Sequence, residues 1–222
     1  MKAVVIGASG GIGAALADAL AARGGAVLRL GRSTAPPLDL LDEASIAAAA
    51  EAAGPRLGLV LDATGFLHDA RFRPEKALRE IDAAHMAQAF AVNAAGPALL
   101  MKHFLPRLAR DGRAVFATLS ARVGSIGDNR LGGWYAYRAS KAALNQFVRT
   151  AAVELARTRP HAICVALHPG TVDTGLSQPF AKGGLDVQDA ATAAVRLLAV
   201  VDALALEQSG GFFDHMGAPI PF

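Results

Sequence analysis

The chain has 222 residues, of which 53% are hydrophobic and 18% are charged, with 22 basic and 19 acidic side chains. This composition excludes a disordered protein and supplies enough apolar surface for the core of one large domain. The basic side chains are scattered rather than clustered, so we expect no nucleic-acid partner. The single cysteine, Cys164, excludes an intrachain disulfide and any cysteine-built metal site, and it fits a reducing compartment such as the cytoplasm.

Two apolar stretches resemble a signal peptide or a membrane span at first sight. Four glycines interrupt residues 1–22, which is unfavourable for the continuous apolar region of a signal peptide. Residues 190–206 contain Arg196 and Asp202, and no run of about 18 uncharged apolar residues occurs in the chain. We therefore expect a cytoplasmic protein without a membrane partner.

Short apolar runs rich in β-branched residues alternate with helical segments along the chain. In chain order, the sequence predicts a strand at 2–7, a helix at 14–23, a strand at 26–30, a helix at 42–53, a strand at 57–63, a helical region at 82–108, a strand at 113–119, a helix at 135–157, a strand at 162–167, a helix at 187–204 and a short strand at 211–214. Nearly continuous apolar strands are typical of a parallel sheet buried on both faces. No repeat or linker divides the chain, so residues 1–222 are predicted to form a single α/β domain, a doubly wound parallel sheet with helices on both faces.

The connection after the second predicted strand is unusually short. Residues 31–37 (GRSTAPP) have room for a turn but not for a crossover helix, and the two prolines disfavour one. We therefore expect a shortened crossover here, with at most a very short strand near Leu38.

A glycine-rich segment, GASGGIG, lies between the first predicted strand and the first helix. Glycines allow a tight turn and a close approach of a pyrophosphate, and the helix N-terminus offers free N–H groups and a positive dipole end. This context favours a dinucleotide-binding turn over a plain tight turn. The predicted binding residues of this turn are Gly7, Ser9, Gly11, Ile12 and Gly13.

The end of the second predicted strand indicates which dinucleotide binds. An acidic residue here usually binds the free ribose 2′-hydroxyl of NAD, whereas a 2′-phosphate favours an arginine. Gly31 offers no carboxylate and Arg32 offers a bidentate phosphate ligand, so NADP(H) is the predicted cofactor. The alternative is that Arg32 is an ordinary solvated side chain.

Tyr137 and Lys141 are four positions apart in a predicted helix and therefore lie on one face of it. A free tyrosine, with a pKa of about 10, is a poor proton donor or acceptor near neutrality. A nearby ammonium favours the phenolate and lowers that pKa, which suits general acid–base catalysis. Tyr135 lacks such a partner, because residue 139 is alanine.

The glycine-rich turn and the Tyr-x-x-x-Lys pair, in this order and spacing, resemble the short-chain dehydrogenase/reductase family over essentially the whole chain. Residues 120–145 and the ending GGFFD at 210–214 are similar to the branch of C-factor and the sniffer-type carbonyl reductases. The resemblance implies a Rossmann-like fold, a nicotinamide cofactor, and hydride transfer to or from a carbonyl carbon.

The resemblance also implies roles for individual residues. Tyr137 corresponds to the family's catalytic acid–base, and Lys141 to the lysine that tunes the tyrosine and binds the ribose. Asn93 corresponds to the asparagine whose main-chain carbonyl holds a water in the proton relay. The sequence adds a physical reason: Pro97 has no N–H for the Asn93 carbonyl, so a helix here is expected to kink and free that acceptor. The alternative is an ordinary capping asparagine between two helices.

Further cofactor contacts are implied by the segment PGTVDT at 169–174, which resembles the family's nicotinamide-binding motif. In that motif the backbone of Val172 and the side chain of Thr174 bind the carboxamide, and Pro169 packs near the ring. Asp39 corresponds to the aspartate that meets the adenine amino group, although an acid that begins the next helix has the same sequence pattern.

The chain departs from the family pattern at three places. Ile6 replaces a threonine, and the residues Asp-Ala-Thr-Gly at 62–65 replace Asn-Asn-Ala-Gly. Most important, Ala121 occupies the position of the serine that polarises the substrate carbonyl. Ser120 is the first candidate for that role, although it needs a twist at the strand end to face the site, and Ser125 is the reserve.

These assignments lead to one main functional hypothesis and one alternative. The main hypothesis is an NADPH-dependent reductase of aldehydes or ketones in which Tyr137 is the general acid. The alternative is an NADP-binding sensor or cell-signalling protein with weak or no turnover, which Ala121 favours and the intact tyrosine–lysine pair opposes.

The sequence supports three further expectations. Residues 175–185 predict a short lid over an open site. Alanine-rich helices and the family resemblance predict a homo-oligomer, either a dimer or a tetramer. The predicted site has no metal, and its catalytic residues are Asn93, Ser120, Tyr137 and Lys141.

Overall fold

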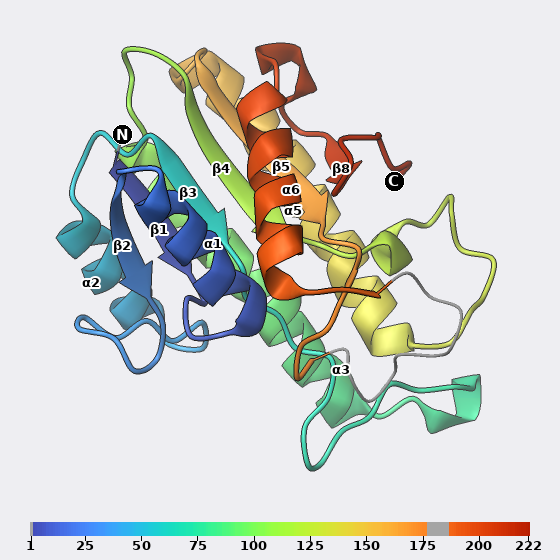
Figure 1. The fold of residues 1–222 in the computed structure, drawn as a ribbon. Helices are drawn as coiled ribbons and strands as arrows, with labels where there is room; N and C mark the ends of the chain where they lie inside the picture. The colour runs from blue at the N-terminus through green and yellow to red at the C-terminus, as the bar shows by residue number, and fades with distance from the viewer. Residues whose placement is uncertain (1, 177–186) are drawn as a thin grey trace.

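The computed structural model describes residues 2–176 and 187–222. Six strands form one parallel sheet in the order β2-β1-β3-β4-β5-β8 (Figure 1). A separate parallel pair joins two short strands, β6 and β7. The predicted architecture, an α/β fold with a parallel sheet, is confirmed. The strands are β1 (Lys2–Ile6), β2 (Ala26–Leu30), β3 (Leu59–Asp62), β4 (Ala114–Leu119), β5 (Ala162–His168), β6 (Thr171–Val172), β7 (Val187–Gln188) and β8 (Phe212–Asp214).

Helices cover both faces of the sheet. On one face α1 packs against α6, and on the other lie α2, α4 and α5 (Figure 1). Within the described residues, no helix is both long and apolar enough to cross a membrane. The α-helices are α1 (Gly11–Ala22), α2 (Glu43–Ala53), α3 (Ala83–Phe90), α4 (Gly96–Phe104), α5 (Tyr135–Thr158) and α6 (Ala190–Ala203).

The core lies on both faces of the sheet, because side chains alternate along each strand. In β1, Val4 and Ile6 contribute to the core under α2, α4 and α5, whereas Ala3 and Val5 contribute to the core under α1 and α6. The central strand β3 is buried at every position. This double burial explains why the strands are apolar at nearly every position.

The connection between β2 and α2 is as short as the sequence predicts. Residues 31–42 contain neither a strand nor a crossover helix. The buried Leu38 instead returns to the end of β2, where its N–H donates to the carbonyl of Gly31 over 2.9 Å. As a result, β2 is an edge strand of the sheet.

Two predicted helical segments differ in detail from the structure. Residues 82–108 comprise α3, a π-helical turn at Ala91–Ala95, α4 and a 3-10 turn. The helix predicted at 187–204 begins only at Ala190, so that prediction was wrong for its first residues. Val187 and Gln188 pair with β6, and Asp189 caps α6 by accepting from the Thr192 N–H. Most of the lid predicted at 175–185, namely residues 177–185, lies outside the described residues.

The turn from β1 into α1 depends on two glycines. Gly7 has a φ of 79°, a left-handed conformation that glycine adopts without strain. A Cβ at Gly13 would lie only 2.1 Å from the Gly7 carbonyl oxygen. Therefore α1 can begin directly against the end of β1 only because residue 13 has no side chain.

Gly13→Ala is expected to destabilise the protein by about 1–3 kcal/mol, the usual cost of overpacking, because the added methyl group collides with backbone. In a chain of this size each kcal/mol lowers the melting temperature by about 2–4 °C, which circular dichroism measures. Gly10→Ala is the matched control, since its Cβ would lie 3.4 Å from the same oxygen. Equal melting temperatures for the two variants would contradict this packing.

Candidate functional site

The predicted site residues gather where the parallel strands end, as expected for the ligand-binding edge of a doubly wound sheet. The N-terminus of α1 opens onto this edge. Ser9, Gly10 and Gly11 are exposed, Ile12 is half-buried, and the first turn of α1 has neither a capping side chain nor an acidic residue. An open helix N-terminus without negative charge offers its N–H groups to an anion. The turn therefore fits the pyrophosphate of a dinucleotide.

The end of β2 lies beside this turn. The N–H of Gly7 donates to the carbonyl of Leu30 over 2.9 Å, and a Cβ at Gly31 would lie 3.6 Å from Ser9 Oγ. The exposed Arg32 follows directly, so it lies at the rim of the same site. Asp39 has a local role further along the loop, where its carboxylate accepts from the N–H of Leu41 over 3.0 Å.

The segment after β5 reaches the same glycine turn from the other side. A Cβ at Gly11 would lie 2.9 Å from Thr174 Cγ2, so Thr174 lies against the start of α1. Val172 is buried in β6, and the Pro169 carbonyl accepts from Gln188 Nε2 over 2.7 Å. The tertiary structure therefore brings the two predicted cofactor motifs together.

Tyr137 and Lys141 lie on the buried side of the first two turns of α5. Tyr137 is 8% exposed and Lys141 is 2% exposed. Lys141 Nζ lies 6.0 Å from the centroid of the Tyr137 ring and donates to the Leu119 carbonyl at the end of β4 over 2.8 Å. The helix thus presents the predicted pair at the carboxyl edge of the sheet.

Burial controls the charges of this pair. Desolvation lowers the pKa of Lys141 to about 8, and the negative charge of Asp62 partly offsets this effect. Burial also raises the pKa of the Tyr137 phenol, which is opposite to the effect expected of the lysine. The phenol is therefore protonated near neutral pH, which is the form that can donate a proton.

Asp62 is a buried carboxylate at the end of β3. Its oxygens accept from Thr64 Oγ1 over 2.6 Å and from Thr118 Oγ1 over 2.7 Å. Burial raises the pKa of the Asp62 carboxyl, whereas these hydrogen bonds and the charge of Lys141 lower it. These partners compensate part of the hydration that the buried carboxyl loses, although burial has the largest effect and leaves its pKa above the ordinary value.

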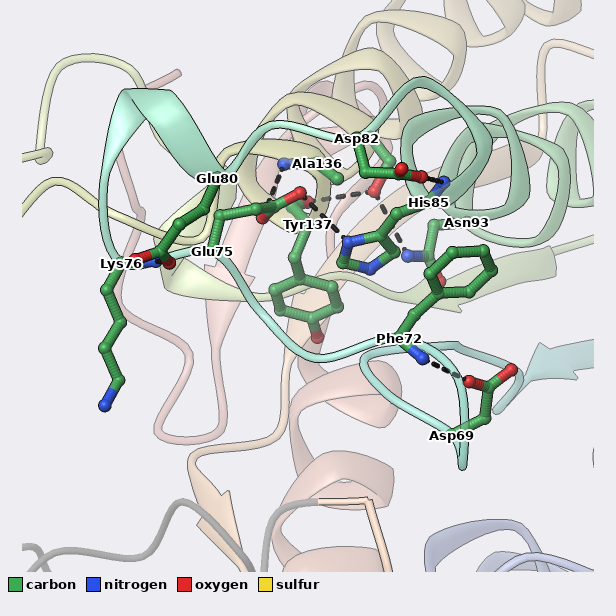
Figure 2. A network of polar contacts seen from close by, with 11 residues as sticks. Asp69, Phe72, Glu75, Lys76, Glu80, Asp82, His85, Asn93, Ala136 and Tyr137 are labelled. Carbon is green, nitrogen blue, oxygen red and sulfur yellow. Dashed lines mark hydrogen bonds and ion pairs between the residues drawn. The ribbon is translucent and has the colours of Figure 1, made fainter.

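The Asn93 side chain joins three segments of the site. Its Oδ1 accepts from the Phe66 N–H and its Nδ2 donates to the Phe66 carbonyl, both over 2.7 Å. Nδ2 also donates to Ser140 Oγ over 3.1 Å, and that hydroxyl donates to the Tyr137 carbonyl over 2.9 Å (Figure 2). The irregularity expected before Pro97 takes the form of a π-helical turn at Ala91–Ala95.

Both candidate serines use their hydroxyl groups within the fold. Ser120 is buried and donates from Oγ to Asn145 Oδ1 over 2.7 Å. Ser125 is buried as well, and its Oγ accepts from the Asp128 N–H over 3.0 Å. The Ser120 side chain therefore turns towards α5, the helix that carries the tyrosine–lysine pair.

Three polar residues of the site were not singled out by the sequence analysis: Asp62, Ser140 and Asn145. A carboxylate that ends the apolar run Leu-Val-Leu-Asp is a signal that could have identified Asp62. Ser140 and Asn145 carry no such signal, because their partners come from other segments. Among the described residues, no group of three or more His, Cys, Asp or Glu side chains is placed to hold a metal ion.

An open glycine turn and a buried tyrosine–lysine pair at the carboxyl edge of a parallel sheet define a dinucleotide-binding α/β protein. Residues 1–183 match the family described as short chain dehydrogenase. The chain belongs to this family of oxidoreductases, as the sequence motifs predict.

Individual relatives support the predicted branch of the family. The chain is 41% identical over 148 residues to C-signal of Myxococcus xanthus, in a match that covers 66% of this chain and 84% of that protein. The NADPH-bound carbonyl reductase from chicken fatty liver is 26% identical with a TM-score of 0.85, and the match covers 100% of this chain and 98% of the other. The carbonyl reductase Sniffer of D. melanogaster has the same fold, with 22% identity, a TM-score of 0.85, and coverage of 100% and 99%. The predicted C-factor and sniffer-like branch is confirmed.

The lowered pKa of Lys141 predicts a pH-dependent contribution to stability. Between its folded pKa of about 8 and the ordinary value of 10.5, the unfolded chain binds a proton that the folded protein has released. Stability rises with pH in such a window. The free energy of unfolding of the wild type should therefore increase relative to that of Lys141→Met, by at most about 1.4 kcal/mol per pH unit. Urea unfolding of both proteins from about pH 7 to about pH 10 measures this difference. A constant difference over that range would contradict the lowered pKa.

Proposed function

We propose that the protein is an NADPH-dependent reductase of aldehydes or ketones. The proposal rests on one observation: the open N-terminus of α1, the exposed Arg32 and the buried pair of Tyr137 and Lys141 share one edge of the sheet. The similar carbonyl reductase from chicken fatty liver, which is described with NADPH bound, supports this reading. When bound, the cofactor supplies a hydride for the carbonyl carbon.

The chain supplies the groups that hold the cofactor. The N–H groups at the start of α1 bind the pyrophosphate, and the glycines of the turn allow it to approach the backbone. The guanidinium of Arg32 binds the 2′-phosphate with charge-assisted hydrogen bonds. Thr174, which lies against the start of α1, would bind the nicotinamide carboxamide, the role that the family resemblance implies.

The chain also supplies the proton. Tyr137 donates from its phenol to the carbonyl oxygen, and burial keeps that phenol protonated before the reaction. The ammonium of Lys141 stabilises the phenolate left behind, and Asp62 helps to keep the lysine charged. The Asn93 carbonyl, which Pro97 cannot bond for lack of an N–H, accepts from the water that returns the proton.

Ser120 is the proposed donor that orients the substrate carbonyl. It directly follows Leu119, whose carbonyl accepts from Lys141 Nζ. To serve in this role, the hydroxyl must turn its proton from Asn145 Oδ1 to the substrate. That exchange gives up one neutral hydrogen bond, which contributes about 1 kcal/mol in a typical protein.

An NADP-binding sensor or cell-signalling protein with weak or no turnover is the second candidate function. Two observations favour it: Ala121 lacks a hydroxyl, and the Ser120 proton already has an acceptor within the fold. The similar protein of Myxococcus xanthus is described as C-signal. Consumption of NADPH with a panel of aldehydes and diketones separates the two functions, because a sensor consumes little or no NADPH.

We further infer that the protein is a cytoplasmic homo-oligomer, a dimer or a tetramer. Support for assembly comes from the exposed surface of α5, where Phe147 is 43% exposed and Val153 is 49% exposed. A groove between α4 and α5, lined partly by Met101 and Leu105, lies beside Phe147. Apolar side chains at such a face favour burial against a second copy.

Arg32→Ala is expected to weaken NADPH binding by about tenfold or more and to leave NADH binding nearly unchanged. The lost arginine–phosphate contact contributes roughly 1.5–3 kcal/mol, and NADH has no phosphate at this position. Arg29→Ala is the matched control, because Arg29 lies in β2, three residues before Arg32, but pairs with Asp18 at 2.6 Å. Fluorescence titration gives the dissociation constants. Equal affinity of the wild type for both cofactors would exclude NADP selectivity.

Tyr137→Phe is expected to abolish measurable turnover, and Ser120→Ala to lower kcat by about 10²-fold, the effect of removing one oxyanion donor. Ser125→Ala is the control and should be nearly silent, because its hydroxyl closes a turn with Asp128. NADPH affinity should change little in all three variants. An inactive Ser125→Ala with an active Ser120→Ala would transfer the role to Ser125. If neither serine affects kcat, Tyr137 alone activates the carbonyl.

A further inference from the structure

The helix that carries Tyr137 begins without a capping side chain of its own. Its N-cap residue, Trp134, makes no side-chain hydrogen bond that caps the helix and has left-handed backbone angles, with φ 54° and ψ 44°. A bulky residue rarely adopts this conformation, which persists only where surrounding contacts enforce it. The first N–H groups of α5 also need partners from elsewhere in the chain.

Glu75, in the loop between β3 and α3, both contacts Trp134 and accepts from an N–H group in the first turn of α5. Its carbonyl accepts from the Trp134 N–H over 2.5 Å, at the left-handed residue itself. Its carboxylate oxygen Oε2 accepts from the N–H of Ala136 over 3.2 Å, in the first turn of α5. A negative charge at a helix N-terminus is also favoured by the helix dipole. Glu75 therefore caps α5 from a segment about 60 positions away in the sequence.

The Glu75 side chain is itself held in place. It is buried, and its second oxygen, Oε1, lies 3.0 Å from His85 Nδ1 of α3. The His85 ring stacks on Phe72, with 5.0 Å between ring centroids and 9° between planes, and meets Phe66 edge-on. Phe66 is the residue that the Asn93 side chain clamps through its backbone. The capping carboxylate thus belongs to the same packed region as Asn93 (Figure 2).

Tyr137 lies immediately after the amide that Glu75 binds, and its ring packs edge-on against Trp134, with 6.1 Å between centroids. Figure 2 shows the Tyr137 hydroxyl pointing away from the Glu75 carboxylate. Any influence of Glu75 on the phenol must therefore act through the backbone of the first turn and the Trp134 ring, not through direct contact.

We propose that Glu75 is a positioning residue for Tyr137: it holds the left-handed Trp134 and the first turn of α5, and so fixes the ring that donates the proton. The inference rests on the role of Tyr137 in the proposed function. Glu75 then affects the rate of proton transfer but not cofactor binding, because the start of α1 and Arg32 bind the cofactor phosphates at the other end of the site.

The test compares Glu75→Ala with the wild type by hydrogen exchange and by kinetics. Amides 136–138 should exchange about tenfold faster, because losing a helix cap destabilises the first turn, while the rest of α5 keeps its protection. The kcat for an aldehyde should fall by about tenfold or more, because proton transfer is sensitive to small displacements. The dissociation constant of NADPH should stay within about twofold.

Two further variants separate the effect of the length of the Glu75 side chain from the effect of its negative charge. Glu75→Gln keeps an oxygen at the position that accepts from Ala136 N–H, so exchange and kcat should recover to within about threefold of the wild type. Glu75→Asp keeps the charge but is one methylene shorter, so both should be impaired. This pair carries the test if Glu75→Ala does not fold, and the reverse order would overturn the proposal. Glu80→Ala is the matched control. Glu80 lies in the same loop, and its exposed carboxylate accepts from the Lys76 N–H rather than from α5.

The remaining outcomes are also decisive. Faster exchange with an unchanged kcat, or a lower kcat with unchanged exchange, would overturn the positioning role. A parallel loss of NADPH affinity would do the same, since it indicates general damage to the site. A wild type that consumes no NADPH would instead overturn the proposed function, whereas an active wild type with a fully active Glu75→Ala overturns only the inference.

Discussion

The buried ammonium of Lys141 is the constraint on which the site depends. A cation removed from water needs polar partners, and here they come from the ends of two neighbouring strands. The Leu119 carbonyl accepts from Nζ, and Asp62 contributes an opposing negative charge. Space is also constrained, because a Cβ at Gly124 would lie only 2.7 Å from Lys141 Cβ. The register of β3 and β4 and the absence of a side chain at Gly124 therefore determine where α5 can pack.

Tyr137 is held by a different set of restraints, which act mainly on its backbone. Ser140 donates to the Tyr137 carbonyl and connects it to Asn93, while Glu75 binds the amide of Ala136 just before it. These restraints come from the helical region 83–104 and from the loop that precedes it, as Figure 2 shows for the residues drawn. The loop is thus part of the site architecture, although the sequence analysis assigned it no element and no role.

Local patterns predicted those features whose causes are local. The apolar run of β1, the turn that begins at Gly7 and the tyrosine–lysine spacing in α5 each depend on neighbours within a few residues, and the structure contains all three. The predicted helix at 187–204 was wrong at its start because Val187 and Gln188 pair with β6, a contact between segments. The expected effect on the Tyr137 pKa likewise considered only Lys141, whereas burial by the whole fold acts in the opposite direction.

The sequence by itself determined the fold class, the family and the position of the cofactor turn, because strand periodicity, glycine placement and a four-residue helical spacing are properties of short segments. Only the tertiary structure decided the partners of the buried polar groups. Ser120 donates a hydrogen bond to Asn145, Asp62 accepts hydrogen bonds from two threonine hydroxyls, and Glu75 caps α5. A buried polar group must find a partner wherever packing places one, and that place is set by the contact of distant segments rather than by the sequence around the group.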